Sequence, residues 1–296
     1  AKRLNLAIGN FNLQNEISLA NRRIIVIPAD ISHDRFGMPH DYYNSLLEKV
    51  DLIYHCGAQV NIMASYGKLR GSNVQGTLEI IKFATQKKDK PIHYISTLSS
   101  AYRKDENGLL AEDFPTESYD HLFGGYAISK WVSERLLTQV CARGLPVTIY
   151  RSGYIFGQSD TGITSLNDAL LMLIKGCIQL GFAPIMEEKI TILPVDYVSH
   201  SIVAISLKQG NQSSVFHIDH PTGIMWSDLV SWLNDYGYKI KKIPMREWQH
   251  LLEKIEPDNA LFPFLPYYLS LKETHQSPDV NTGKALHILT ELNLPF

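Results

Sequence analysis

The chain has 296 residues, of which 45% are hydrophobic and 20% are charged. These fractions are ordinary for a folded domain, so they exclude disordered and fibrous chains. The formal net charge of −2 gives no electrostatic basis for binding nucleic acid or an anionic membrane. No apolar run approaches the ~20 residues that span a bilayer, and nothing near the start is typical of a signal peptide. Three widely spaced cysteines indicate a reducing compartment, so we expect a cytoplasmic protein.

The first half of the chain alternates β-branched runs with amphipathic stretches. Apolar residues at helical spacing predict an opening helix over residues 4–11. Strands are predicted at residues 23–27, 50–55, 91–97 and 146–151. Helices are predicted at residues 42–49, 69–88 and 126–143. This alternation predicts an α/β fold, a Rossmann-type parallel sheet with right-handed crossovers and helices on both faces.

The second half of the chain has a different character and predicts a smaller, helix-rich lobe. Its predicted elements are a short strand at 216–218 and helices at 168–178, 196–207, 227–236 (with Ser227 as the N-cap) and 245–255. We therefore expect residues 1–155, with about 191–220, to form a cofactor-binding domain. Residues 156–190 and 221–296 are expected to form the substrate-binding lobe.

Polar and small residues follow the predicted strands. In parallel sheets, ligands bind beyond the carboxyl ends of the strands. The residues at those positions are Asp30, Gly57, Ala58, Thr97, Ser152 and Gly153. An acidic residue, two small-residue turns and a hydroxyl are thus expected at one edge of the sheet.

Tyr126 and Lys130 lie four residues apart on a predicted helix and therefore share one face. An ammonium group near a phenol favours phenolate and lowers its pKa, which suits a group that exchanges a proton with an alkoxide. Alone, this pair is more often a half-buried tyrosine beside a solvated lysine that pairs with Glu134. Thr97, at the end of the preceding strand, could donate to the same oxyanion. The joint pattern favours catalysis.

Five segments of the sequence resemble those of one known family. They are residues 54–61 (YHCGAQVN), 73–77 (NVQGT), 95–99 (ISTLS), 125–131 (GYAISKW) and 194–198 (PVDYV). With Thr97, Tyr126 and Lys130, they resemble the thioester reductase domains of nonribosomal peptide and polyketide synthases. These domains are extended short-chain dehydrogenases/reductases. The resemblance runs from about residue 23 to residue 248.

The resemblance implies a two-electron reduction by NADPH. The substrate would be an acyl or peptidyl thioester on the phosphopantetheine arm of a carrier protein, within a multidomain synthase. Thr97 and Tyr126 would stabilise the oxyanion, and Lys130 would contact the nicotinamide ribose and keep Tyr126 acidic. The product would be an aldehyde, which some family members reduce again to an alcohol.

The same resemblance implies where the cofactor lies. Asp30 would face the adenine and Ile31 would also bind the cofactor, whereas Asn73 would be a structural link between helix and strand. The other residues that would line the cofactor are Gly57, Ala58, Ser152 and Gly153. The sequence offers no HExxH motif and no zinc-binding spacing of cysteines, so no metal is predicted.

One feature of the family is missing from the sequence, the Gly-x-x-Gly-x-x-Gly turn that cradles the pyrophosphate. The first glycine is Gly9, and nothing near it fits that turn. We therefore expect the cofactor domain to be incomplete at its N-terminus, and the choice of NADPH depends on the resemblance alone. Two alternatives stay open. One is a fatty acyl-CoA or aldehyde reductase, and the other is a non-catalytic module that binds a carrier protein.

Overall fold

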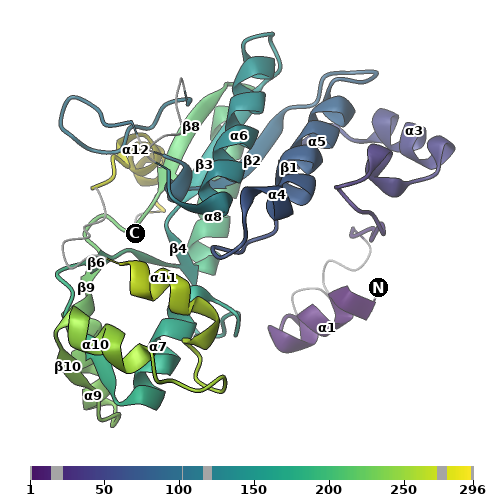
Figure 1. Cartoon of the computed structure of the whole chain (residues 1–296). Coiled ribbons are helices and arrows are strands. Elements are labelled where there is room, and N and C mark those ends of the chain that lie inside the picture. The colour runs from purple at the N-terminus through teal and green to yellow at the C-terminus, as the bar shows by residue number, and fades with distance from the viewer. Residues whose placement is uncertain (1, 15–22, 102, 116–121, 272–278, 295–296) are drawn as a thin grey trace.

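The computed structural model describes residues 2–14, 23–101, 103–115, 122–271 and 279–294. Its centre is a four-stranded sheet in the order β1-β2-β3-β8 (Figure 1). The strands are Ile53–His55 (β1), Ile92–Thr97 (β2), Val147–Ser152 (β3) and Ser214–Ile218 (β8). Every neighbouring pair is parallel, so the predicted parallel α/β sheet is confirmed.

Helices cover both faces of this sheet. Along β3, Ile149 packs in the core formed with helices α3 (His40–Lys49), α5 (Gly76–Ala84) and α6 (Gly124–Cys141). The next residue, Tyr150, packs in a second core with α8 (Val195–Gln209) and α12 (Gly283–Glu291). Successive residues of a strand point to opposite faces, which is why one strand serves two cores. Figure 1 shows α5 and α6 side by side along the sheet.

The predicted helix over residues 69–88 is one helical stretch of three parts. It begins with α4 (Tyr66–Leu69), continues through the π-helical segment η2 (Arg70–Gln75) and ends with α5. A π-helical turn inside a helix often marks a functional site. Here the turn carries Asn73, which is buried.

The strand predicted at residues 23–27 is wrong. This segment belongs to no sheet, and Ile25 is 82% exposed. A β-branched run becomes a strand only where a neighbouring strand pairs with its backbone groups. Among the described residues, nothing pairs with 23–27 in that way. The opening helix, in contrast, is confirmed as α1 (Lys2–Asn10).

A third core lies in the lower part of Figure 1. It joins α7 (Ala169–Leu180), α9 (Trp226–Asp235), α10 (Met245–Leu252) and α11 (Leu265–Ser270) around the fully buried Trp226 and Trp248. Three small two-stranded sheets brace it, formed by β5 (Phe182–Pro184) with β10 (Lys241–Ile243), β6 (Lys189–Ile190) with β9 (Ile224–Met225), and β4 (Tyr154–Phe156) with β7 (Ile192–Pro194). The predicted cap is wrong, because α9 begins before Ser227 and its N-cap residue is Met225.

The C-terminal helix α12 packs against α8 and β8, beside the central sheet, although its residues fall within the predicted substrate lobe. The division of the chain into two domains stays a prediction. Within the described ranges, no helix is long and apolar enough to cross a bilayer.

Candidate active site

Helix α6 presents Tyr126, Lys130 and Glu134 at successive four-residue steps, so all three lie on one face. Lys130 is only 2% exposed, and its Nζ donates a 2.7 Å hydrogen bond to the carbonyl oxygen of Ile95. The same Nζ lies 4.0 Å from the centroid of the Tyr94 ring. A buried ammonium group in contact with a carbonyl and an aromatic face is not a solvated surface lysine. The alternative interpretation of Lys130, a solvated lysine that pairs with Glu134, is therefore wrong.

Tyr126 holds its proton tightly. Burial raises the pKa of its phenol to about 12, whereas the sequence predicted a pKa lowered by Lys130. The prediction fails because spacing along a helix gives no measure of how deeply a phenol is buried. Burial likewise lowers the pKa of Lys130 to about 7, and the nearby Glu134 acts in the opposite direction. A protonated phenol suits reduction, in which the oxygen of the substrate must gain a proton.

Gly125 allows the loop before α4 to lie against the first turn of α6. A Cβ at this position would lie 2.3 Å from the backbone nitrogen of Tyr66 and 2.5 Å from the carbonyl oxygen of Ala64. Both atoms belong to the backbone, so neither can rotate away. Because Gly125 has no side chain, the start of the helix that carries Tyr126 can pack directly against this loop.

We expect Gly125→Ala to lower the free energy of unfolding by about 1–3 kcal/mol, as overpacking commonly does. The activity should fall as well, because Tyr126 must shift with the start of the helix. Gly67→Ala is the matched control, since a Cβ at that helical position meets nothing within 4 Å. Urea unfolding and turnover of both variants test this prediction, and equal behaviour would contradict it.

Thr97 lies where predicted, at the carboxyl end of β2. It is the N-cap of the short helix η3 (Leu98–Ser100), and its Oγ1 accepts a 3.2 Å hydrogen bond from the backbone nitrogen of Ser99. This bond uses a lone pair of the hydroxyl and leaves its hydrogen available to another acceptor. Ile95, which binds Lys130, lies two residues earlier on the same strand, so β2 brings Thr97 close to the lysine on α6.

The predicted adenine-side residues lie in a turn and not after a strand. Asp30 is exposed, and its Oδ1 accepts hydrogen bonds from the backbone nitrogen and the hydroxyl of Ser32, which lower the pKa of the carboxyl. Ile31 still reaches the end of β1. A Cβ built on Gly57 would lie 3.2 Å from the Cδ1 of Ile31, and one built on Gly76 would lie 3.0 Å from it. The structure thus brings Ile31 to Gly57, which Ala58 follows.

Asn73 is the structural link that the sequence predicted. Its Oδ1 accepts from the backbone nitrogen of Gln59 at 2.7 Å, and its Nδ2 donates to the carbonyl oxygen of Gln59 at 3.1 Å. Nδ2 also donates to the hydroxyl of Ser129 at 2.9 Å. Asn73 therefore ties the loop after β1 to α6, one residue before Lys130. The sequence did not predict this second contact.

Ser152 and Gly153 also lie at the expected edge. Ser152 ends β3 and pairs in register with Thr97 on one side and with Ile218 on the other. Gly153 follows, and a Cβ there would lie 2.1 Å from Oδ1 of the buried Asp219. A side chain at this position would have to displace that carboxyl group. Burial raises the pKa of Asp219 to about 6.

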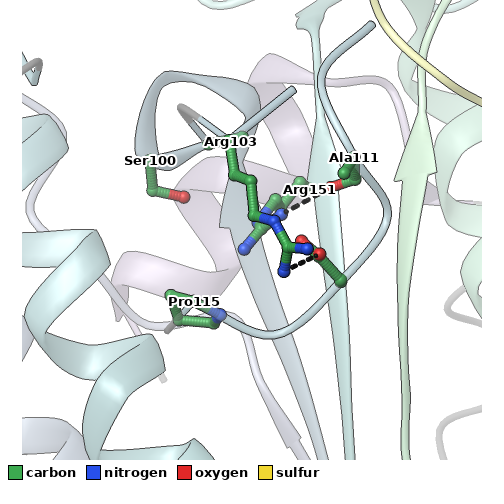
Figure 2. Close-up of a pocket in the computed structure, with 7 residues that line it drawn as sticks. Ser100, Arg103, Ala111, Pro115 and Arg151 are labelled. Carbon is green, nitrogen blue, oxygen red and sulfur yellow. Dashed lines mark hydrogen bonds and ion pairs between the residues drawn. The ribbon is translucent and has the colours of Figure 1, made fainter. Parts of the chain in front are cut away.

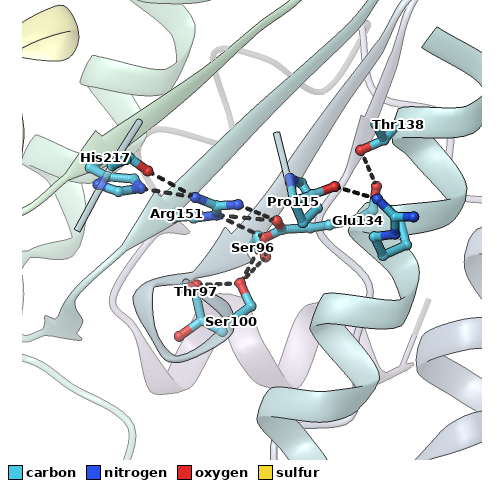
Figure 3. Close-up of polar contacts among 10 residues, drawn as sticks. Ser96, Thr97, Ser100, Pro115, Glu134, Thr138, Arg151 and His217 are labelled. Carbon is cyan, nitrogen blue, oxygen red and sulfur yellow. Dashed lines mark hydrogen bonds and ion pairs between the residues drawn. The ribbon is translucent and has the colours of Figure 1, made fainter. Parts of the chain in front are cut away.

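The sequence missed a buried polar network behind Thr97 (Figure 3). Glu134 and Arg151 form an ion pair with a shortest N···O distance of 2.6 Å, and their side chains are 0% and 3% exposed. Burial alone would raise the pKa of Glu134, but Arg151 and two serine hydroxyls outweigh it and hold the pKa below the ordinary value. Arg151 Nη1 also lies 3.1 Å from the Nε2 of His217. Glu134 thus pairs with Arg151 and not with Lys130. The sequence feature that could have drawn attention to Glu134 is its position four residues after Lys130, on the same face of the helix.

Figure 2 shows a small pocket that Ser100 and Arg151 of this network help to line. Its lining residues are Ser100, Ala101, Arg103, Ala111, Asp113, Pro115 and Arg151, and its volume is about 10 Å³. Arg103 and Asp113 close it with an ion pair of 2.7 Å. This pocket is too small for a thioester. In the described part of the chain, no cluster of three His, Cys, Asp or Glu side chains could hold a metal ion.

Known proteins are similar to this chain in sequence and in fold. The chain is 34% identical over 242 residues to one of the proteins that make up the linear gramicidin synthase of Brevibacillus parabrevis, covering 81% of this chain and 5% of that protein. It is similar to the terminal R domain from the myxalamid PKS-NRPS pathway, with a TM-score of 0.89, 32% identity and coverage of 97% of this chain and 74% of that one. For a thiolation-reductase di-domain from an archaeal nonribosomal peptide synthetase, the TM-score is 0.78, the identity 26% and the coverage 97% and 62%.

The Rossmann-type parallel sheet and these similarities define the class of the protein, an NAD(P)H-dependent oxidoreductase. An NAD-binding family model described as male sterility protein matches residues 1–202. The chain therefore belongs to the male sterility protein family, among its thioester reductase (R) domains. It spans only 5%, 21% and 16% of the length of the first three curated relatives that it matches.

Proposed function

We propose that this chain reduces an acyl or peptidyl thioester, held on the phosphopantetheine arm of a carrier protein, to an aldehyde with NADPH. A second reduction would give an alcohol. The observation that carries the proposal is Lys130, which is buried on α6 one turn after Tyr126 and donates a hydrogen bond to the strand that ends in Thr97. The similarity to R domains and to a thiolation-reductase di-domain supports a carrier-bound substrate.

The residues at the sheet edge fit a nicotinamide cofactor. Gly57 follows β1 and has no side chain. A Cβ at this position would occupy the space next to Ile31. Lys130 donates one hydrogen bond among the described residues, so its other N–H groups can bind the ribose. We assign Asp30 and Ile31 to the adenine side. Gly57, Ala58, Ser152 and Gly153 would line the rest of the cofactor.

A nicotinamide bound there would supply the hydride that the thioester carbonyl carbon accepts. Thr97 donates a hydrogen bond to the carbonyl oxygen as negative charge develops on it. Tyr126 gives that oxygen its proton, and the product is a thiohemiacetal. When this collapses, the C–S bond breaks, the phosphopantetheine thiol leaves with a proton and the aldehyde is released. Lys130 would hold the ribose, and its ammonium group would stabilise the phenolate that forms on Tyr126 until solvent returns the proton.

The remaining parts of the chain are assigned by position. We propose that residues 156–190 and 221–296 contribute the substrate-binding lobe, and that residues 1–155 with about 191–220 contribute the cofactor domain. The protein would act in the cytoplasm as part of a multidomain synthase, where its three free cysteines remain reduced.

The test compares one acyl group presented in two forms, on a carrier protein and on coenzyme A. Faster NADPH-dependent aldehyde formation from the carrier-bound thioester is the expected result. Preference for coenzyme A would instead indicate an acyl-CoA reductase. Binding of the loaded carrier without turnover would favour the non-catalytic module.

A further inference from the structure

The hydroxyl groups around Glu134 connect three elements that carry the site (Figure 3). Ser96, on β2, donates to Oε1 of Glu134 at 2.5 Å. Ser100, at the end of η3, lies 2.7 Å from the same Oε1 and 2.7 Å from the carbonyl oxygen of Thr97. One carboxylate on α6 thus holds the residue before Thr97 and the residue that closes the turn after it.

Arg151 gives this carboxylate a fixed orientation from β3. Its Nε lies 3.1 Å from both carboxylate oxygens of Glu134, and its Nη2 lies 2.6 Å from Oε2. Such a two-pronged contact restrains rotation of the carboxylate more than a single bond does. The guanidinium is held in turn by the carbonyl oxygen of Ala111 at 3.3 Å and by His217.

The imidazole of His217 is neutral, because burial and the adjacent Arg151 lower its pKa to about 3. Its Nδ1 lies 2.9 Å from the carbonyl oxygen of Asn281, to which it donates, so Nε2 is free to accept from Arg151. The chain of contacts therefore runs from β8 through β3 to α6, with each polar group satisfied by the next. A fully satisfied buried network is rigid.

We propose that Glu134 is a positioning residue that, through Ser96 and Ser100, sets the distance between Thr97 on β2 and the Tyr126–Lys130 face of α6. The inference rests on the function proposed above, because it concerns the geometry of the same site. Tyr126 and Lys130 lie two turns and one turn before Glu134 on the same face. Because the Glu134 carboxylate is held by Ser96 and Ser100, the positions of Tyr126 and Lys130 are fixed relative to the carboxyl end of β2.

The test uses the double variant Ser96→Ala/Ser100→Ala. It removes both hydroxyl contacts but leaves the Glu134–Arg151 ion pair intact, so the fold should persist. We expect kcat for the thioester to fall roughly tenfold or more with little change in KM, because a misplacement of about 1 Å between catalytic groups slows chemistry by up to about 100-fold. Ser201→Ala is the matched control, since Ser201 is a buried serine on α8, on the other side of the sheet.

A second readout does not depend on activity. Hydrogen exchange of the backbone amides at 97–101 and at 124–130 should quicken in the double variant and not in the Ser201→Ala control. Turnover and exchange equal to those of the control would overturn the inference. If the wild-type protein reduces no thioester, the proposed function fails, and the exchange measurement alone still decides whether Ser96 and Ser100 clamp the two elements together.

Discussion

Tyr126→Phe is expected to lower kcat for thioester reduction by roughly 10²–10⁴-fold, the usual contribution of a general acid. The variant loses only the phenolic oxygen, so the half-buried ring keeps its place on α6. Burial raises the pKa of the Tyr126 phenol to about 12, which means that the group arrives at the reaction carrying its proton. Without it, water would have to protonate the oxygen of the thiohemiacetal.

Tyr236→Phe serves as the control for this substitution. Tyr236 is 83% exposed and follows α9, which packs in the third core. Steady-state kinetics on both variants should show the loss in kcat only for Tyr126→Phe, with KM nearly unchanged. If Tyr126→Phe retained nearly full turnover, the assignment of the proton donor would be wrong.

Arg151→Met should lower the free energy of unfolding by about 3–5 kcal/mol, the range found when one partner of a buried ion pair is removed. Glu134 would then remain buried without its counterion. Two serine hydroxyls would still donate to it, but they carry no charge. Urea unfolding followed by circular dichroism measures the loss.

The double variant Glu134→Gln/Arg151→Met distinguishes the charge from the packing. It removes both charges together, so its stability should exceed that of Arg151→Met alone even though two side chains differ from the wild type. If the double variant were instead less stable than Arg151→Met by the full cost of a second, independent substitution, the two charges would not depend on each other.

Much of the fold could be predicted because hydrophobic patterns report local structure. The strands β2 and β3 and the helix α6 form within one or two residues of the predicted bounds. The segment 23–27 has an equally good strand pattern and yet joins no sheet. A pattern indicates that a segment can pair, but pairing also needs a neighbouring strand, and that is a property of the whole molecule.

The site was predictable to a similar extent. The spacing of Tyr126 and Lys130 places both on one face of a helix, and the structure has them there. The pKa values were not predictable, because they depend on burial by residues far away in the chain. The pairing of Glu134 with Arg151 was missed for the same reason, since it joins a helix to a strand 17 residues later and only the packed sheet brings them together.

The most direct test of the central claim is to follow hydrogen from the cofactor into the product. The purified protein is incubated with a carrier-bound acyl thioester and NADPH deuterated at C4 of the nicotinamide, and the released product is analysed by mass spectrometry. We predict an aldehyde with one deuterium on its carbonyl carbon when the transferred hydrogen is the labelled one, in the wild type and not in Tyr126→Phe over the same time. Release of the free acid, or of an aldehyde that carries no deuterium from either C4 epimer, would contradict the account.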